Sequence, residues 1–156
     1  MSPGPYLNIG VFQTKITDND LVGPKEELGS WRYEGAKVVR YVKSGSLVPQ
    51  YEGLKLDATV TTAALMGNQV LQCDGLTNMF FGVADNATFA NLSFGWVTMY
   101  GPATARVATT TIPESSLGPS ANTGVLSIRS TCHFNAVAVA LQTGISAGSA
   151  VFVTVL

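Results

Sequence analysis

The chain has 156 residues, of which 46% are hydrophobic and only 12% are charged. This length fits one ordinary domain with its own core, and the apolar content excludes an intrinsically disordered chain. The formal net charge of −1 excludes the basic surface that binding to nucleic acid or to an anionic membrane requires, so we expect neither partner.

The few charges are concentrated near the N-terminus. Residues 1–57 hold seven of the nine lysines and arginines and seven of the ten acidic residues, which leaves five charges for the other 99 residues. A monomer with so uncharged a surface would be poorly protected against association. We therefore expect residues 58–156 to be covered by other copies of the chain or by a partner, and we expect an oligomer.

The N-terminal segment predicts an arm rather than a targeting signal. Its sequence, MSPGPYLNIG, lacks the basic and apolar regions of a signal peptide, and no apolar stretch reaches the roughly 20 residues of a membrane span. We therefore expect synthesis and assembly in the cytoplasm. Proline and glycine favour an extended arm over residues 1–13, with an edge strand near 6–12, and a single β-rich domain over 14–156.

Short strands separated by turns account for most of the remaining sequence. Residues 16–31 are rich in Asp, Asn, Gly and Pro and are predicted to form loops. Segments 36–43 and 54–60 are predicted strands, because β-branched, aromatic or alternating apolar residues lie between turn signals. The segment 63–72 fits either a short helix or a strand. Further strands are predicted at 79–84, 94–100, 103–109, 123–128, 133–141 and 150–156, with turns at Gly101-Pro102 and Gly118-Pro119.

Many short strands without a sustained helical period predict an all-β fold, either a small β-sandwich or a barrel-like domain with an extended N-terminal arm. In the segment 137–141 the large residues Val137, Val139 and Leu141 alternate with alanines, and we expect this strand to be buried on both sides. The final AVFVTVL is expected to pair inside the sheet or against a neighbouring subunit. Trp96 is the expected core anchor.

Residues that could catalyse a reaction or bind a metal are few, and their spacing matches no catalytic or metal-binding motif. Cys73 and Cys132 lie 59 positions apart; two buried free thiols are the favoured interpretation, and a disulfide stays open. His133 is the only histidine, and as the strand neighbour of Cys132 it points to the opposite face. One histidine and two distant cysteines are too few ligands for a zinc site, and the sequence contains no phosphate-binding loop motif. We therefore predict no enzyme, no cofactor and no metal.

Two other patterns have ordinary explanations. The run Asp18, Asn19, Asp20 resembles the start of a calcium loop but lacks a glutamate at the twelfth position, so an Asx turn is expected. The aromatic and basic residues of segment 31–41 would suit a nucleic-acid surface, but Glu34 and the nearby acidic residues cancel their charge. Cross-strand packing with a charged rim is the better interpretation.

Three short motifs carry a resemblance to a known family. They are RYVKSG at 40–45, GVA at 82–84 and GWV at 95–97 followed by Gly101. In this order they resemble the small head-decoration, or cement, proteins that stabilise the capsids of tailed bacteriophages. The resemblance spans roughly residues 28–109. The longer middle segment 61–78 and the stretch TTTIPESSLGPSANTG depart from the pattern.

The resemblance implies a structural protein of the virion that sits outside the capsid, commonly as a trimer, and clamps neighbouring copies of the major capsid protein. The arm would supply the capsid contacts, and the later strands the core and the trimer contacts. The alternative is a phage surface module that binds a host glycan, which exposed aromatic residues would favour. The expected capsid contacts are Tyr6, Leu7, Ile9, Val11 and Phe12, and the expected core and trimer residues are Trp96, Val97, Tyr100, Val137, Val139 and Phe152.

Overall fold

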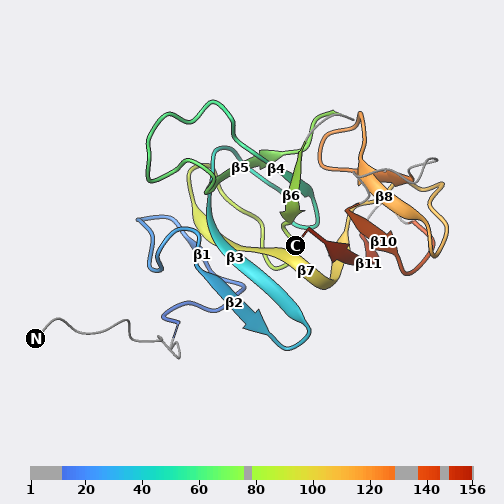
Figure 1. Cartoon of the computed structure of the whole chain (residues 1–156), viewed down its shortest axis with the longest axis horizontal. Helices are drawn as coiled ribbons and strands as arrows, with labels where there is room; N and C mark the ends of the chain where they lie inside the picture. Colours follow the sequence, from blue (N-terminus) through green and yellow to red (C-terminus); the bar gives the residue numbers. More distant parts are fainter. Residues whose placement is uncertain (1–11, 76–78, 129–136, 145–147, 156) are drawn as a thin grey trace, which may run out of the picture.

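The structure is a computed structural model that describes residues 12–75, 79–128, 137–144 and 148–155. These residues form eleven strands and no helix, so the predicted all-β class is confirmed (Figure 1). The strands are β1 (Asn19–Asp20), β2 (Trp31–Glu34), β3 (Lys37–Ser44), β4 (Gly53–Leu56), β5 (Gln69–Gln72), β6 (Phe80–Val83), β7 (Phe94–Ala105), β8 (Ser116–Pro119), β9 (Leu126–Ile128), β10 (Ala138–Ala140) and β11 (Ser149–Thr154).

Five strands close into a barrel. The order β3-β5-β4-β6-β7 returns to its start because β7 also pairs antiparallel with β3. Apolar side chains fill the interior because alternate residues of each strand point inward. Val42, Leu54, Val70, Phe81 and Val97 are among the buried residues of this core. The predicted barrel-like domain is therefore present.

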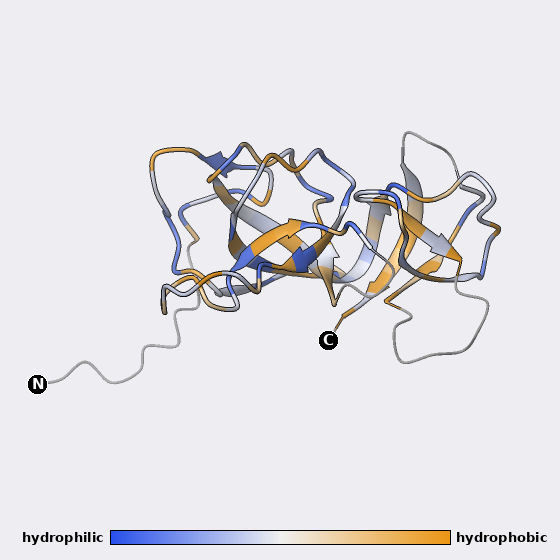
Figure 2. Ribbon diagram, turned by 90° about the horizontal axis from the view of Figure 1, so that it is seen from above, coloured by the Kyte–Doolittle hydropathy of each residue, from blue (hydrophilic) through white to orange (hydrophobic). Residues whose placement is uncertain are grey.

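A second set of strands curls back on itself next to the first barrel. The C-terminal half of β7 pairs with β11, and the sheet continues through β10 and β8 to β9. A parallel bridge between Val107 and Leu126 then returns β9 to the residues that follow β7. Small and branched residues fill this second core, including Ala103, Ala105, Leu117 and Val151. Figure 2 shows the two lobes side by side, with hydrophobic residues on the strands of both.

Strand β7 belongs to both lobes, which corrects the predicted turn at Gly101-Pro102. The strand runs without a break from Phe94 to Ala105. Gly101 has a φ of 102°, which side chains rarely adopt, and a Cβ there would collide with the carbonyl oxygen of Ala36. Pro102 lies opposite Phe152 on β11. Glycine and proline therefore shape a twisted strand here instead of ending it.

Three other boundary predictions were wrong for local reasons. The strand predicted over 54–60 ends at Leu56, because the Asp57 carboxylate accepts hydrogen bonds from the N–H and hydroxyl of Thr59 and forms a turn. Gly118-Pro119 lies inside β8 rather than in a turn. Residues 31–34, where no separate strand was predicted, form β2, which pairs with β3 through a two-residue connection at Gly35 and Ala36.

The N-terminal part of the described chain covers the outer side of the first barrel. Trp96 and Tyr41 point outward from β7 and β3, and Phe12, Ile16 and Leu28 pack over them. The Trp96 indole N–H donates to the Thr14 hydroxyl at 2.9 Å. This third cluster extends the core beyond the barrel wall.

Candidate interaction surface

One face of the sheet carries a row of uncharged residues across three strands. Phe152 of β11 lies opposite Pro102 of β7 on one side and Val139 of β10 on the other. Residues directly opposite each other share one face of a sheet. Tyr100, two residues before Pro102 on β7, packs its ring against Phe152. The uncharged face therefore consists of Tyr100, Pro102, Phe152 and Val139.

The orientation of β10 corrects the prediction that this strand is buried on both sides. Ala138 and Ala140 point into the second core, where each is 1% exposed. Val139 is 36% exposed and Leu141 is 52% exposed, so the larger side chains point to solvent. Short side chains suit the interior of this lobe, whose five paired segments leave little room. The arrangement places apolar surface outside, where a partner can cover it.

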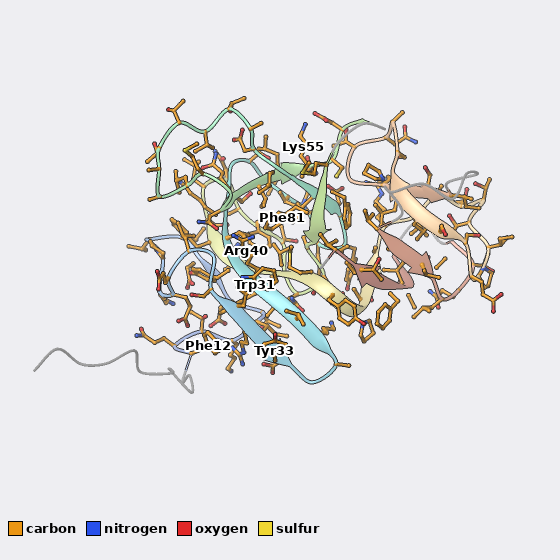
Figure 3. The ribbon with its side chains drawn as sticks, viewed as in Figure 1. Phe12, Trp31, Tyr33, Arg40, Lys55 and Phe81 are labelled. Carbon is orange, nitrogen blue, oxygen red and sulfur yellow. The ribbon has the colours of Figure 1, made fainter. Side chains whose placement is uncertain are left out.

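Aromatic side chains give the uncharged face its shape. The rings of Tyr100 and Phe152 meet edge to face, with centroids 5.2 Å apart. Outside this face, Tyr33 of the edge strand β2 is 80% exposed. Figure 3 shows Tyr33 and Trp31 on the same strand, with Arg40 next to Trp31. Exposed aromatic rings are typical of protein interfaces.

Three charges of residues 58–156 are neutralised by ion pairs. Asp74 pairs with Lys55 at 2.6 Å, and Arg106 pairs with Glu52 at 3.1 Å. Asp85 forms a short ion pair with Lys37. In each case a charge from the later part of the chain is neutralised by one from the first 57 residues. Glu114 is exposed on a turn beside β8, and Arg129 lies outside the described residues.

The carboxylates of two of these ion pairs, Asp85 and Glu52, are buried where the lobes meet. Asp85, whose side chain is nearly inaccessible, also accepts the main-chain N–H of Thr104 at 2.7 Å. This bond uses the edge of β7 that β11 does not occupy. Glu52 accepts hydrogen bonds from Arg106 and Gln72 and lies against Gly124, where a Cβ would overlap the carboxylate. Buried carboxylates with several donors hold the segments around them in one arrangement.

The predicted trimer and core residues separate into two groups. Trp96 and Val97 are buried in the third cluster and in the first barrel, and Val137 is half-buried against the second core. Tyr100, Val139 and Phe152 come together on the uncharged face. Alternate residues of β10 and β11 point to opposite faces, so the sequence pattern indicates that Val139 and Phe152 each differ in orientation from their neighbours. The pattern does not say which face of each strand packs against the core.

The predicted capsid contacts Tyr6, Leu7, Ile9 and Val11 lie outside the described residues. Phe12 is described, and its ring packs edge to face on Trp96 with centroids 5.1 Å apart. The guanidinium of Arg32 lies 5.1 Å from the centre of the same ring. These contacts fix the point at which the N-terminal segment meets the barrel.

Catalytic and ligand-binding groups are sparse in the described chain. No group of three or more His, Cys, Asp or Glu residues in it is arranged to hold a metal ion. No helix among the same residues is long and apolar enough to cross a membrane. A shallow apolar groove of about 540 Å³ lies between the segment 55–60, Met66 and Met79. His133 and Cys132 lie outside the described residues, so their relation to Cys73 stays a prediction.

We expect Cys73 to be unreactive in the folded protein. Its thiol is fully buried in the second core, and burial raises its pKa to about 12. At pH 8 almost none of it is the nucleophilic thiolate. In a Cys132→Ser variant, labelling by a disulfide reagent should be negligible in buffer and stoichiometric in denaturant. Rapid labelling of the native variant would contradict the buried position of Cys73.

Comparison with known proteins finds a likeness in structure but none in sequence. No protein-family model matches the chain, and no curated protein matches it. The structure is similar to that of the head fiber gp8.5 N base in bacteriophage phi29, with a TM-score of 0.48 and 13% sequence identity. The likeness covers 77% of this chain and 94% of that chain. The role of this chain is therefore inferred from its own residues and surfaces.

Proposed function

We propose that the protein is a structural component of a tailed-phage virion, which binds the outside of the capsid as a homotrimer. In this role it stabilises the shell by clamping neighbouring copies of the major capsid protein. It would assemble in the host cytoplasm and act by binding rather than by catalysis. Many modest contacts made at once would give such a clamp its effect.

The motifs that carry the family resemblance support this proposal. RYVKSG begins on β3, GVA lies at the end of β6, and GWV lies on β7. All three strands belong to the first barrel, and Tyr41 of the first motif lies directly opposite Trp96 of the third. The resemblance therefore concerns one structural unit rather than scattered positions.

The uncharged face is the observation that carries the proposal. A surface with aromatic and aliphatic side chains, and with the neighbouring charges already paired, is suited to close contact with other copies of the chain. No described residue of the row is charged. Three copies packed through this face would cover the part of the sequence that lacks charge, and residues 6–12 would remain for the capsid.

Mass by light scattering, followed by co-sedimentation with undecorated capsids, tests the proposal. We expect a trimer that pellets with the capsids. A variant that lacks residues 1–11 is the matched control; it should remain trimeric and should stay in the supernatant. A monomer that ignores capsids and binds host glycans would replace the proposal with the alternative of a glycan-binding surface module.

A further inference from the structure

Strand β2 has a free edge. Among the described residues it pairs only with β3. The Ser30 carbonyl accepts the N–H of Tyr41 at 2.9 Å, so it points toward β3, as do the main-chain groups of Glu34, the last β2 residue before the two-residue turn. Because these groups alternate along an antiparallel strand, those of Trp31 and Tyr33 point away from the sheet. Two N–H donors and two carbonyl acceptors are thus available to another strand.

This edge is held firmly in place. On one face of β2, Arg32 lies over the rings of Phe12 and Trp96 and donates to the Thr14 carbonyl at 2.8 Å. On the other face, Trp31 lies 5.2 Å from the guanidinium of Arg40. The strand contains no proline, one of the usual devices that protect an edge from pairing. An ordered edge without proline can act as a template for a further strand whose charges match its own.

The sequence of β2 is complementary to itself in one antiparallel register. When Tyr33 lies opposite Tyr33 of a second copy, each Arg32 lies opposite the other copy's Glu34. Arg32 already pairs with its own Glu34 at 2.7 Å, so both side chains lie on the same face. Opposite charges directly across a strand pair are favourable, whereas the register that centres on Arg32 would place two arginines together.

We infer that β2 pairs with β2 of a second copy across a two-fold axis, with Tyr33 opposite Tyr33. The partner is a second copy because the charges of β2 complement themselves. The contact is short, so it is weak between free molecules and becomes significant where copies are held close together. It would join trimers to one another. The contact does not depend on the proposed capsid role, since it is built from β2 alone.

Cross-linking through a single cysteine tests this pairing without any capsid. A hydrogen-bonded antiparallel pair has its Cα atoms about 5.5 Å apart, which suits a disulfide. In the Cys132→Ser background, we expect Tyr33→Cys to form a covalent dimer under oxidised glutathione roughly tenfold faster than the control. The control is Val22→Cys, at another fully exposed position. Equal rates for the two variants would overturn the inference.

A change of charge on β2 tests whether cross-linking depends on this register or only on random collisions between molecules. Adding Glu34→Lys to Tyr33→Cys places a lysine opposite Arg32 of the second copy, so cross-linking should fall to the control rate. Glu114→Lys makes the same change at an exposed position outside β2 and should leave the rate unchanged. Insensitivity to Glu34→Lys would overturn the proposed register. The assay can succeed even if the protein never binds a capsid, so the two proposals fail separately.

Discussion

Replacing Trp96 with alanine should lower the free energy of unfolding by about 3–5 kcal/mol. The side chain is 1% exposed and packs between Tyr41 and Phe12, with ring centroids at 5.2 and 5.1 Å. Its removal leaves a cavity and deprives the Thr14 hydroxyl of a donor. Because this cluster attaches the N-terminal segment to the barrel, the loss combines packing and anchoring. Urea unfolding followed by circular dichroism measures the change.

The matched control for Trp96 is the other tryptophan of the chain. Trp31 is 43% exposed on the edge strand β2. Its replacement by alanine should cost about 1 kcal/mol or less, because exposed positions lose little packing. Equal destabilisation by the two substitutions would show that the third cluster is not a core.

Replacing Val139 with glutamate should convert the proposed trimer to monomers. The substitution places a carboxylate on the uncharged face, between Phe152 and Ser116. An unpaired charge buried at an interface costs about 3–5 kcal/mol, which corresponds to association weaker by roughly 10²- to 5 × 10³-fold. Because the Val139 side chain points to solvent in the single chain, the monomer should remain folded. Light scattering over a range of concentrations measures the effect.

Leu47→Glu is the control for this experiment. Leu47 is an exposed apolar residue on the connection that follows β3, outside the row that forms the uncharged face. It should leave the mass of the oligomer unchanged. A Val139→Glu protein that stays trimeric would place the subunit contact on another surface.

Local sequence patterns predicted the strands of this protein better than their connections. Segment 36–43 was recognisable because β-branched and aromatic residues lie between glycines, and it forms β3 almost to the residue. Closure of the barrel depends on the pairing of β3 with β7, about 55 residues later, and no local pattern carries that information. The turn predicted at Gly101-Pro102 was wrong because these residues lie inside β7, where the glycine allows the close approach of the Ala36 carbonyl.

The candidate surface was only half predictable. The scarcity of charge after residue 57 predicted that this part of the chain is covered by other copies or by a partner. Tyr100, Val139 and Phe152 were among the expected contacts. The sequence could not show that Ala138 and Ala140 face the core, because alternation fixes two faces without saying which is inside. It also could not show that Lys37, Glu52 and Lys55 neutralise distant charges, since ion pairs depend on the fold.

The shared strand β7 couples the unfolding of the two lobes. Trp96 and Val97 at one end of β7 hold it in the first barrel and the third cluster, and Ala103 and Ala105 at the other end hold it in the second core. If either lobe unfolds, β7 loses the strand with which it pairs in that lobe. The other lobe is then weakened, because β7 is also one of its own strands. We therefore expect the lobes to melt together as one cooperative unit. A partner bound to the second lobe would then protect the first lobe from proteolysis and heat without contacting it.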